Sequence, residues 1–143
     1  MIRALSVAAM LAIGVTVAFA QSAAVSQRQD AMKALSNATK APGAMLKGEA
    51  SFDLAKVKAT LTTYREELTK LKGLWPDDSK SGDTYALPAV WEKKPEFIAL
   101  IDKFLAETEA ASSKIADEAT LKAEWPKLMR NCGGCHKEYR KPS

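Results

Sequence analysis

The chain has 143 residues, of which 21 are Lys or Arg, 17 are Asp or Glu, one is His and two are Cys. This length suits one domain of ordinary size, and a composition that is 47% hydrophobic and 27% charged is typical of a folded globular protein and not of a disordered one. The net charge of +4 comes without a clustered stripe of basic residues, which argues against nucleic-acid binding.

The chain begins with the features of a secretory signal peptide. Arg3 supplies a positive charge, residues 4–17 form an uncharged apolar run, and Ala18-Phe19-Ala20 has the small-x-small pattern of a cleavage site. We expect cleavage before Gln21, so that residues 1–20 are removed and residues 21–143 form one exported domain. The alternative is a membrane anchor, but the apolar run is short for a bilayer span and no membrane span follows it.

Four later segments have apolar residues spaced by three and four, which predicts amphipathic helices, while strand signals are nearly absent. The expected helices cover about 25–40, 57–71, 95–115 and 119–139, and Pro42-Gly43 is expected to interrupt or end the first. The apolar stripe of the first consists of Met32, Leu35 and Thr39. Such narrow stripes can be buried only against neighbouring helices, which predicts an all-α, antiparallel (up-down-up-down) four-helix bundle.

Three connections join these helices. The segments 47–51 and 116–118 are short, which makes the helices on either side of each one antiparallel neighbours. The segment 73–94 is long and contains Trp75 and Trp91 among polar and turn-forming residues. A connection of that length usually has a function or packs on another part of the molecule.

Both cysteines and the only histidine lie within Cys132-Gly133-Gly134-Cys135-His136, the pattern of covalent c-type haem attachment. On a helix, residues three apart share a face, so both thiols can bond to the vinyl groups of one porphyrin. His136 then becomes the proximal iron ligand. The pattern predicts one covalently attached haem c per chain.

Three other interpretations of this motif compete. Cys132 and Cys135 could form a structural disulfide in an oxidising compartment. They could form a thioredoxin-like redox pair, although such a pair normally follows a strand at a helix N-terminus. A zinc site would need a fourth ligand, which the remaining Cys and His content cannot supply. Export favours haem, since c-type attachment occurs outside the cytoplasm.

The bundle topology suggests a second iron ligand. The start of the first helix and the end of the fourth lie at the same end of the bundle, so Met32 and His136 can face each other across one cofactor. Met32 could instead be an ordinary core residue, because Met fills irregular gaps. Met45 and Met129 are alternative ligands, but Met129 lies on the haem-bearing helix itself.

The Cys-x-x-Cys-His on the last helix, Arg140 four residues after the His, and Arg28-Gln29-x-x-Met32 on the first helix resemble the class II cytochromes c. These comprise the five-coordinate cytochromes c′ and low-spin, methionine-ligated relatives, which the chain resembles most. The resemblance covers essentially all of the mature chain and implies a periplasmic four-helix haem protein, often a homodimer in the cytochrome c′ branch.

The resemblance also implies that Arg28, Gln29 and Arg140 contact the haem. For Arg28 the alternative is a solvated surface residue, and for Arg140 it is a cation that stabilises the last helical turn.

Two functions follow for a haem protein of this kind. With His136 and Met32 both bound, iron has no open position for a substrate, which suits one-electron transfer with redox partner proteins. With the sixth position open, the haem would bind NO or CO, in scavenging or sensing. No acid-base set is visible, so we expect a carrier and not an enzyme. Without haem, the two thiols would instead form a thiol-disulfide oxidoreductase.

Overall fold

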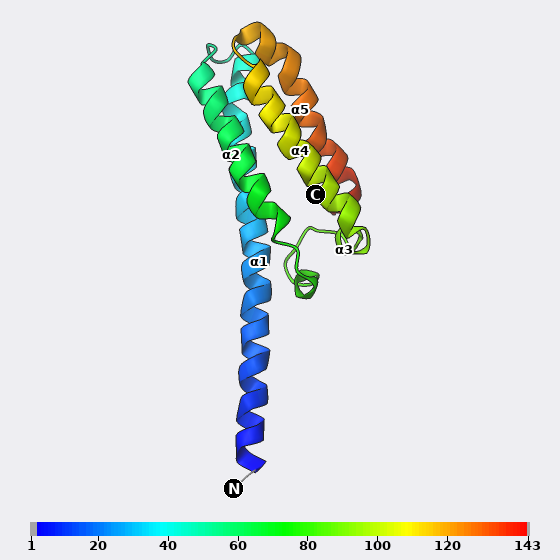
Figure 1. Cartoon of the computed structure of the whole chain (residues 1–143). Coiled ribbons are helices and arrows are strands. Elements are labelled where there is room, and N and C mark those ends of the chain that lie inside the picture. Colours follow the sequence, from blue (N-terminus) through cyan, green and yellow to red (C-terminus); the bar gives the residue numbers. More distant parts are fainter. Residues whose placement is uncertain (1–2, 143) are drawn as a thin grey trace.

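The computed structural model describes the backbone of residues 3–142 and the side chains of residues 23–142. Its helices are α1 (Arg3–Leu46), α2 (Leu54–Lys72), the 3-10 helix η1 (Asp77–Ser79), α3 (Ala89–Glu92), α4 (Lys94–Lys114) and α5 (Glu118–Tyr139). The long helices α1, α2, α4 and α5 run alternately up and down (Figure 1). Among the described residues, β-structure is limited to an isolated bridge between Ala86 and Arg140. The predicted four-helix bundle is confirmed.

The segment expected to be a signal peptide forms the N-terminal part of α1, which extends beyond the end of the bundle (Figure 1). Its side chains, together with residues 1 and 2, lie outside the described part of the chain. Cleavage before Gln21 therefore stays a prediction. None of the helices in the described part combines the length and apolarity needed to cross a bilayer.

The prediction that α1 is interrupted at Pro42-Gly43 is wrong, because the helix continues to Leu46 with Pro42 inside it. Proline has no N–H, so the carbonyl of Ala38 loses its helical donor. The hydroxyl of Thr60 on α2 donates to that carbonyl instead, at 3.0 Å. The helix ends at Leu46, and the turn that follows contains Gly48, whose φ of 74° is one that glycine adopts without strain.

The predicted apolar stripe of α1 is also wrong in part. Met32 is 38% exposed, while the preceding Ala31 is only 3% exposed. The residues of α1 that pack on the bundle are spaced by three and four, and they include a charged side chain and a proline. These residues are Arg28, Ala31, Leu35, Ala38, Pro42 and Met45.

The predicted apolar stripes of α2, α4 and α5 are buried, except that Cys132 and Cys135 on α5 are half-buried, and these three helices enclose most of the core. Tyr64 lies at its centre, in ring contact with Phe104 of α4 and Trp125 of α5. The predicted short connections are present, and Asp117 caps the start of α5 by accepting a hydrogen bond from the Thr120 amide at 2.7 Å. The cap fixes the start of α5, while both cysteines lie near its other end.

Candidate functional site

The two cysteines lie on the last part of α5 and not at a helix N-terminus. Both are free thiols, half-buried, and packed against the hydrophobic core. Burial raises the pKa of Cys132, and burial together with the nearby Cys132 and Glu138 raises that of Cys135 to about 11. Because the thiolate is the reactive form in thiol exchange, these protonated thiols are poor candidates for a dithiol oxidoreductase.

His136 follows directly and is half-buried. Burial, and then the positive charge of Arg140, lower the pKa of its imidazole. The neutral imidazole that results is the form that binds a metal ion. Arg140 itself lies just past the end of α5, with its guanidinium carbon 5.9 Å from the centre of the Tyr85 ring. The predicted contact between Arg140 and the haem stays a prediction.

The hydroxyl of Tyr64 shows how α1 and α5 are aligned. It lies 2.5 Å from the Thr39 hydroxyl oxygen on α1 and 3.9 Å from the Met129 sulfur on α5. Met32 precedes Thr39 by seven residues, and His136 follows Met129 by seven. Seven residues are about two helical turns, or about 10 Å, so each step ends on the helix face where it began. Because α1 and α5 are antiparallel, both steps run in the same direction along the bundle. Met32 and His136 are therefore level with each other.

The three candidate methionines differ in their surroundings. Met45 is buried near the far end of α1, about 20 Å along the helix from Met32. The Met129 sulfur is engaged by the Tyr64 hydroxyl. The Met32 side chain is partly exposed and does not belong to the core cluster, so it can reach a group bound against α1.

Arg28 and Gln29 lie one turn before Met32 and contact the long connection between α2 and α4. Arg28 is only 4% exposed, so the alternative of a solvated surface residue is wrong. Its guanidinium donates to the carbonyls of Leu74 and Ser79, at 2.9 and 3.0 Å, and to the Ser79 hydroxyl at 2.7 Å. The amide of Gln29 donates to the Asp83 carbonyl at 2.9 Å.

Two tryptophans complete the surroundings of Arg28. Its guanidinium carbon lies 4.6 Å from the ring centre of Trp75 and 5.6 Å from that of Trp91. Burial lowers the pKa of this side chain, and it forms no ion pair among the described residues. A buried Ser79 and these backbone carbonyls around Arg28 could not be predicted from the sequence, because none of them belongs to an apolar pattern.

These side chains fit a haem. Within the described residues, no three His, Cys, Asp or Glu side chains are placed to hold a metal ion by themselves. Iron in a porphyrin brings four nitrogen ligands, so it needs only axial ligands such as His136 and Met32. Cys132 and Cys135 share a helix face and can form the two thioethers. Arg28, a buried cation without a carboxylate partner, suits the haem propionates, although this contact stays a prediction, as does one from Gln29.

Comparison with known proteins agrees with this assignment. A family model described as cytochrome C′ matches residues 23–140. The chain is 41% identical to a cytochrome c′ of Rhodopseudomonas palustris, with 97% of this chain and 96% of the relative covered. It is 34% identical to a cytochrome c-556 of the same organism, with 98% and 97% covered.

Solved structures give the same result. The cytochrome c′ structure from Rhodopseudomonas palustris has a TM-score of 0.82 and 43% identity, with 84% of this chain and 97% of that chain covered. An NMR-validated model of oxidised cytochrome c556 from the same organism has a TM-score of 0.76 and 30% identity, with the same coverage. Members of this family are non-enzymatic haem proteins, and the Cys-x-x-Cys of Cys132 and Cys135 is consistent with the one covalent haem c of the family. The chain belongs to the cytochrome c′ family of class II cytochromes c.

Proposed function

We propose that this protein carries single electrons through a haem whose iron is bound by His136 and Met32. The observation that supports this most is that these two residues lie at the same level on α1 and α5, as inferred from the contacts of the Tyr64 hydroxyl. When bound, the haem supplies the one-electron chemistry, and a thioether ligand favours its ferrous state.

The chain's own residues keep both ligands in place. Cys132 and Cys135 fix the haem to α5, and the neutral imidazole of His136 presents a ligand nitrogen. On the other side, Arg28 ties α1 to the long connection, and the Tyr64 hydroxyl ties it to the core. Because both helices are held on either side of the cofactor, an electron can be gained or lost with little rearrangement.

A second candidate function is the binding of NO or CO at an open sixth position. Overall similarity favours it, since identity to the cytochrome c′ relative is 41% and identity to the c-556 relative is 34%. Nitric oxide complexes are known for cytochrome c′ variants from Alcaligenes xylosoxidans, whose 23% identity to this chain shows the shared fold alone. In this case Met32 would line the open side without binding iron.

We also propose that the mature protein begins at Gln21 and acts in the periplasm, as the family does. The cytochrome c′ relative from Rhodopseudomonas palustris aligns with 97% of this chain, whereas the solved cytochrome c′ structure from that organism aligns with 84%. A removed N-terminal segment accounts for that difference. The partners would be other exported redox proteins, and dimer formation stays a prediction.

The visible spectrum of the protein, produced with haem-attachment machinery, separates the two functions. We expect sharp low-spin bands and no change when CO is added to the reduced protein. Met32→Ala should then give a high-spin spectrum and bind CO, whereas Met45→Ala, in the same helix, should leave the spectrum unchanged. A high-spin spectrum of the unmodified protein that shifts with CO would instead establish gas binding.

A further inference from the structure

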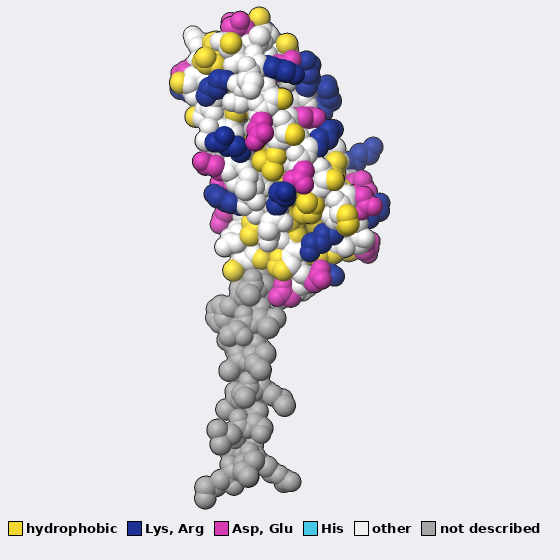
Figure 2. Space-filling model, viewed as in Figure 1, with side chains coloured by type: hydrophobic (Ala, Val, Ile, Leu, Met, Phe, Trp, Pro, Cys, Tyr) yellow, Lys and Arg dark blue, Asp and Glu magenta, His cyan; other side chains and the backbone are white. Residues whose placement is uncertain are grey.

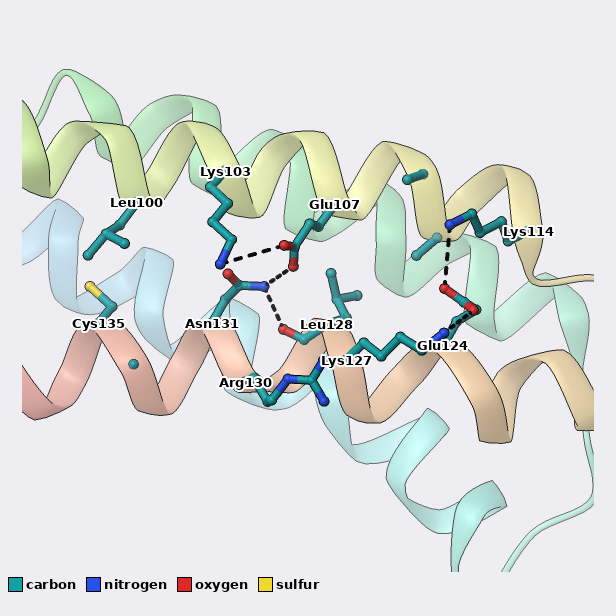
Figure 3. Close-up of a pocket in the computed structure, with 13 residues that line it drawn as sticks. Leu100, Lys103, Glu107, Lys114, Glu124, Lys127, Leu128, Arg130, Asn131 and Cys135 are labelled. Carbon is teal, nitrogen blue, oxygen red and sulfur yellow. Dashed lines mark hydrogen bonds and ion pairs between the residues drawn. The ribbon is translucent and has the colours of Figure 1, made fainter.

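A groove of about 350 Å³ runs between α4 and α5, and the core residues Ala111 and Leu128 form part of its lining (Figure 3). One end is formed by Leu100, Gly134 and Cys135, and the other by Lys114 and Glu124. The groove thus connects the surface with one of the two sulfur atoms that carry the haem.

The groove has an excess of positive charge. Its charged lining consists of Lys103, Lys114, Lys127 and Arg130 against Glu107 and Glu124, which leaves two positive charges. Figure 2 shows Lys and Arg side chains gathered along the α4–α5 side of the bundle. The whole mature chain has an excess of only three positive charges, so this groove accounts for a large part of it.

Both carboxylates in the groove already have partners. Glu124 accepts a hydrogen bond from Lys127 at 2.6 Å and lies 3.8 Å from Lys114. Glu107 lies 3.7 Å from Lys103, and its other oxygen accepts from the Asn131 amide. Arg130 forms no ion pair among the described residues and has no dashed contact in Figure 3. The free positive charge can therefore attract carboxylates from outside the chain.

The end of the groove next to Cys135 is also open to close approach. Gly134 is exposed and helical, and a Cβ atom there would meet nothing within 4 Å. A glycine in the lining leaves the backbone of α5 bare beside the sulfur, and electron tunnelling between proteins falls steeply with distance.

We propose that the α4–α5 groove is the docking surface for a redox partner protein that presents carboxylate side chains. This inference rests on the proposed electron transfer. One electron passes between the partner's redox centre and the haem beside Cys135, so that one is oxidised as the other is reduced. No bond forms or breaks.

Two pairs of variants in the haem-loaded protein test this surface. Arg130→Glu reverses the unpaired charge in the groove, while Arg65→Glu makes the same change on the exposed face of α2. Gly134→Gln places a side chain in the groove beside Cys135, while Gly133→Gln, one residue earlier, does so outside the groove. The first measurement is the stopped-flow rate of oxidation by hexacyanoferrate(III), an anion, at low and high salt. The second is the same rate with a cationic cobalt(III) complex.

We expect Arg130→Glu to slow the anionic oxidant about tenfold at low salt, where the screening length exceeds about 10 Å, and much less at high salt. It should speed the cationic oxidant. Gly134→Gln should slow both oxidants more than Gly133→Gln does. Equal effects within both pairs, at matched midpoint potentials and with unchanged spectra, would overturn the docking surface while leaving the proposed function intact. A high-spin, CO-binding wild type would overturn both.

Discussion

Replacement of Arg28 by Met should destabilise the haem-loaded protein more than the loss of any exposed basic residue. The guanidinium makes three hydrogen bonds to Leu74 and Ser79 and lies over two tryptophan rings. Hydrogen bonds from a charged donor contribute about 1.5–3 kcal/mol each, but removal of the buried charge recovers part of that loss. We expect a net loss of about 3 kcal/mol in the free energy of unfolding.

Urea unfolding measures this loss. For a slope of about 2 kcal/mol per M, the midpoint should fall by about 1.5 M. Arg28→Lys should give an intermediate value, because an ammonium keeps the charge but not the fork of donors. Arg65→Met, at an exposed position, should change stability by less than about 0.5 kcal/mol. Amide exchange in residues 73–88 should become faster in Arg28→Met alone. A loss below about 1 kcal/mol, or unchanged exchange there, would refute the role assigned to Arg28.

Two further predictions concern the helices themselves. Thr60→Val should lower the free energy of unfolding by about 1–2 kcal/mol in urea, because the Ala38 carbonyl loses its donor. Pro42→Ala restores an N–H for that carbonyl, so it should reduce the cost of Thr60→Val. An equal cost of Thr60→Val with and without Pro42→Ala would contradict the pairing. Hydrogen bonds from Thr120 lower the pKa of Asp117 below its ordinary value of 3.8. The ionised cap therefore stabilises the fold fully above pH 3.8, and this stabilisation is lost as the pH falls through the lowered pKa of Asp117. Asp117→Asn, which keeps an acceptor oxygen without the charge, should flatten that part of the acid unfolding curve, and an unchanged curve would contradict it.

The sequence predicted α2, α4 and α5 well because their buried stripes consist of apolar residues at regular spacing. It misjudged α1 for a physical reason. Arg28 and Pro42 lie on its packed face, and neither looks apolar or helical in a periodic pattern. Their burial depends on partners far along the chain, namely Ser79 for the guanidinium and Thr60 for the carbonyl that proline leaves without a donor.

The candidate site was predictable in its chemistry and less so in its geometry. The spacing of Cys132, Cys135 and His136 identifies haem attachment within five residues of sequence. The level of Met32 relative to His136 depends on how α1 and α5 slide past each other, which the Tyr64 hydroxyl reveals only in the folded chain. The basic groove was hidden as well, because its residues alternate with acidic ones along both helices and gather only when α4 and α5 pack.

X-ray absorption at the iron edge of the reduced, haem-loaded protein counts the atoms bound to iron and so tests its ligation most directly. Five nitrogen neighbours and one sulfur are expected, with the sulfur absent in Met32→Leu and retained in Met129→Leu. Five nitrogen neighbours without sulfur in the unmodified protein would contradict electron transfer through a methionine-bound iron.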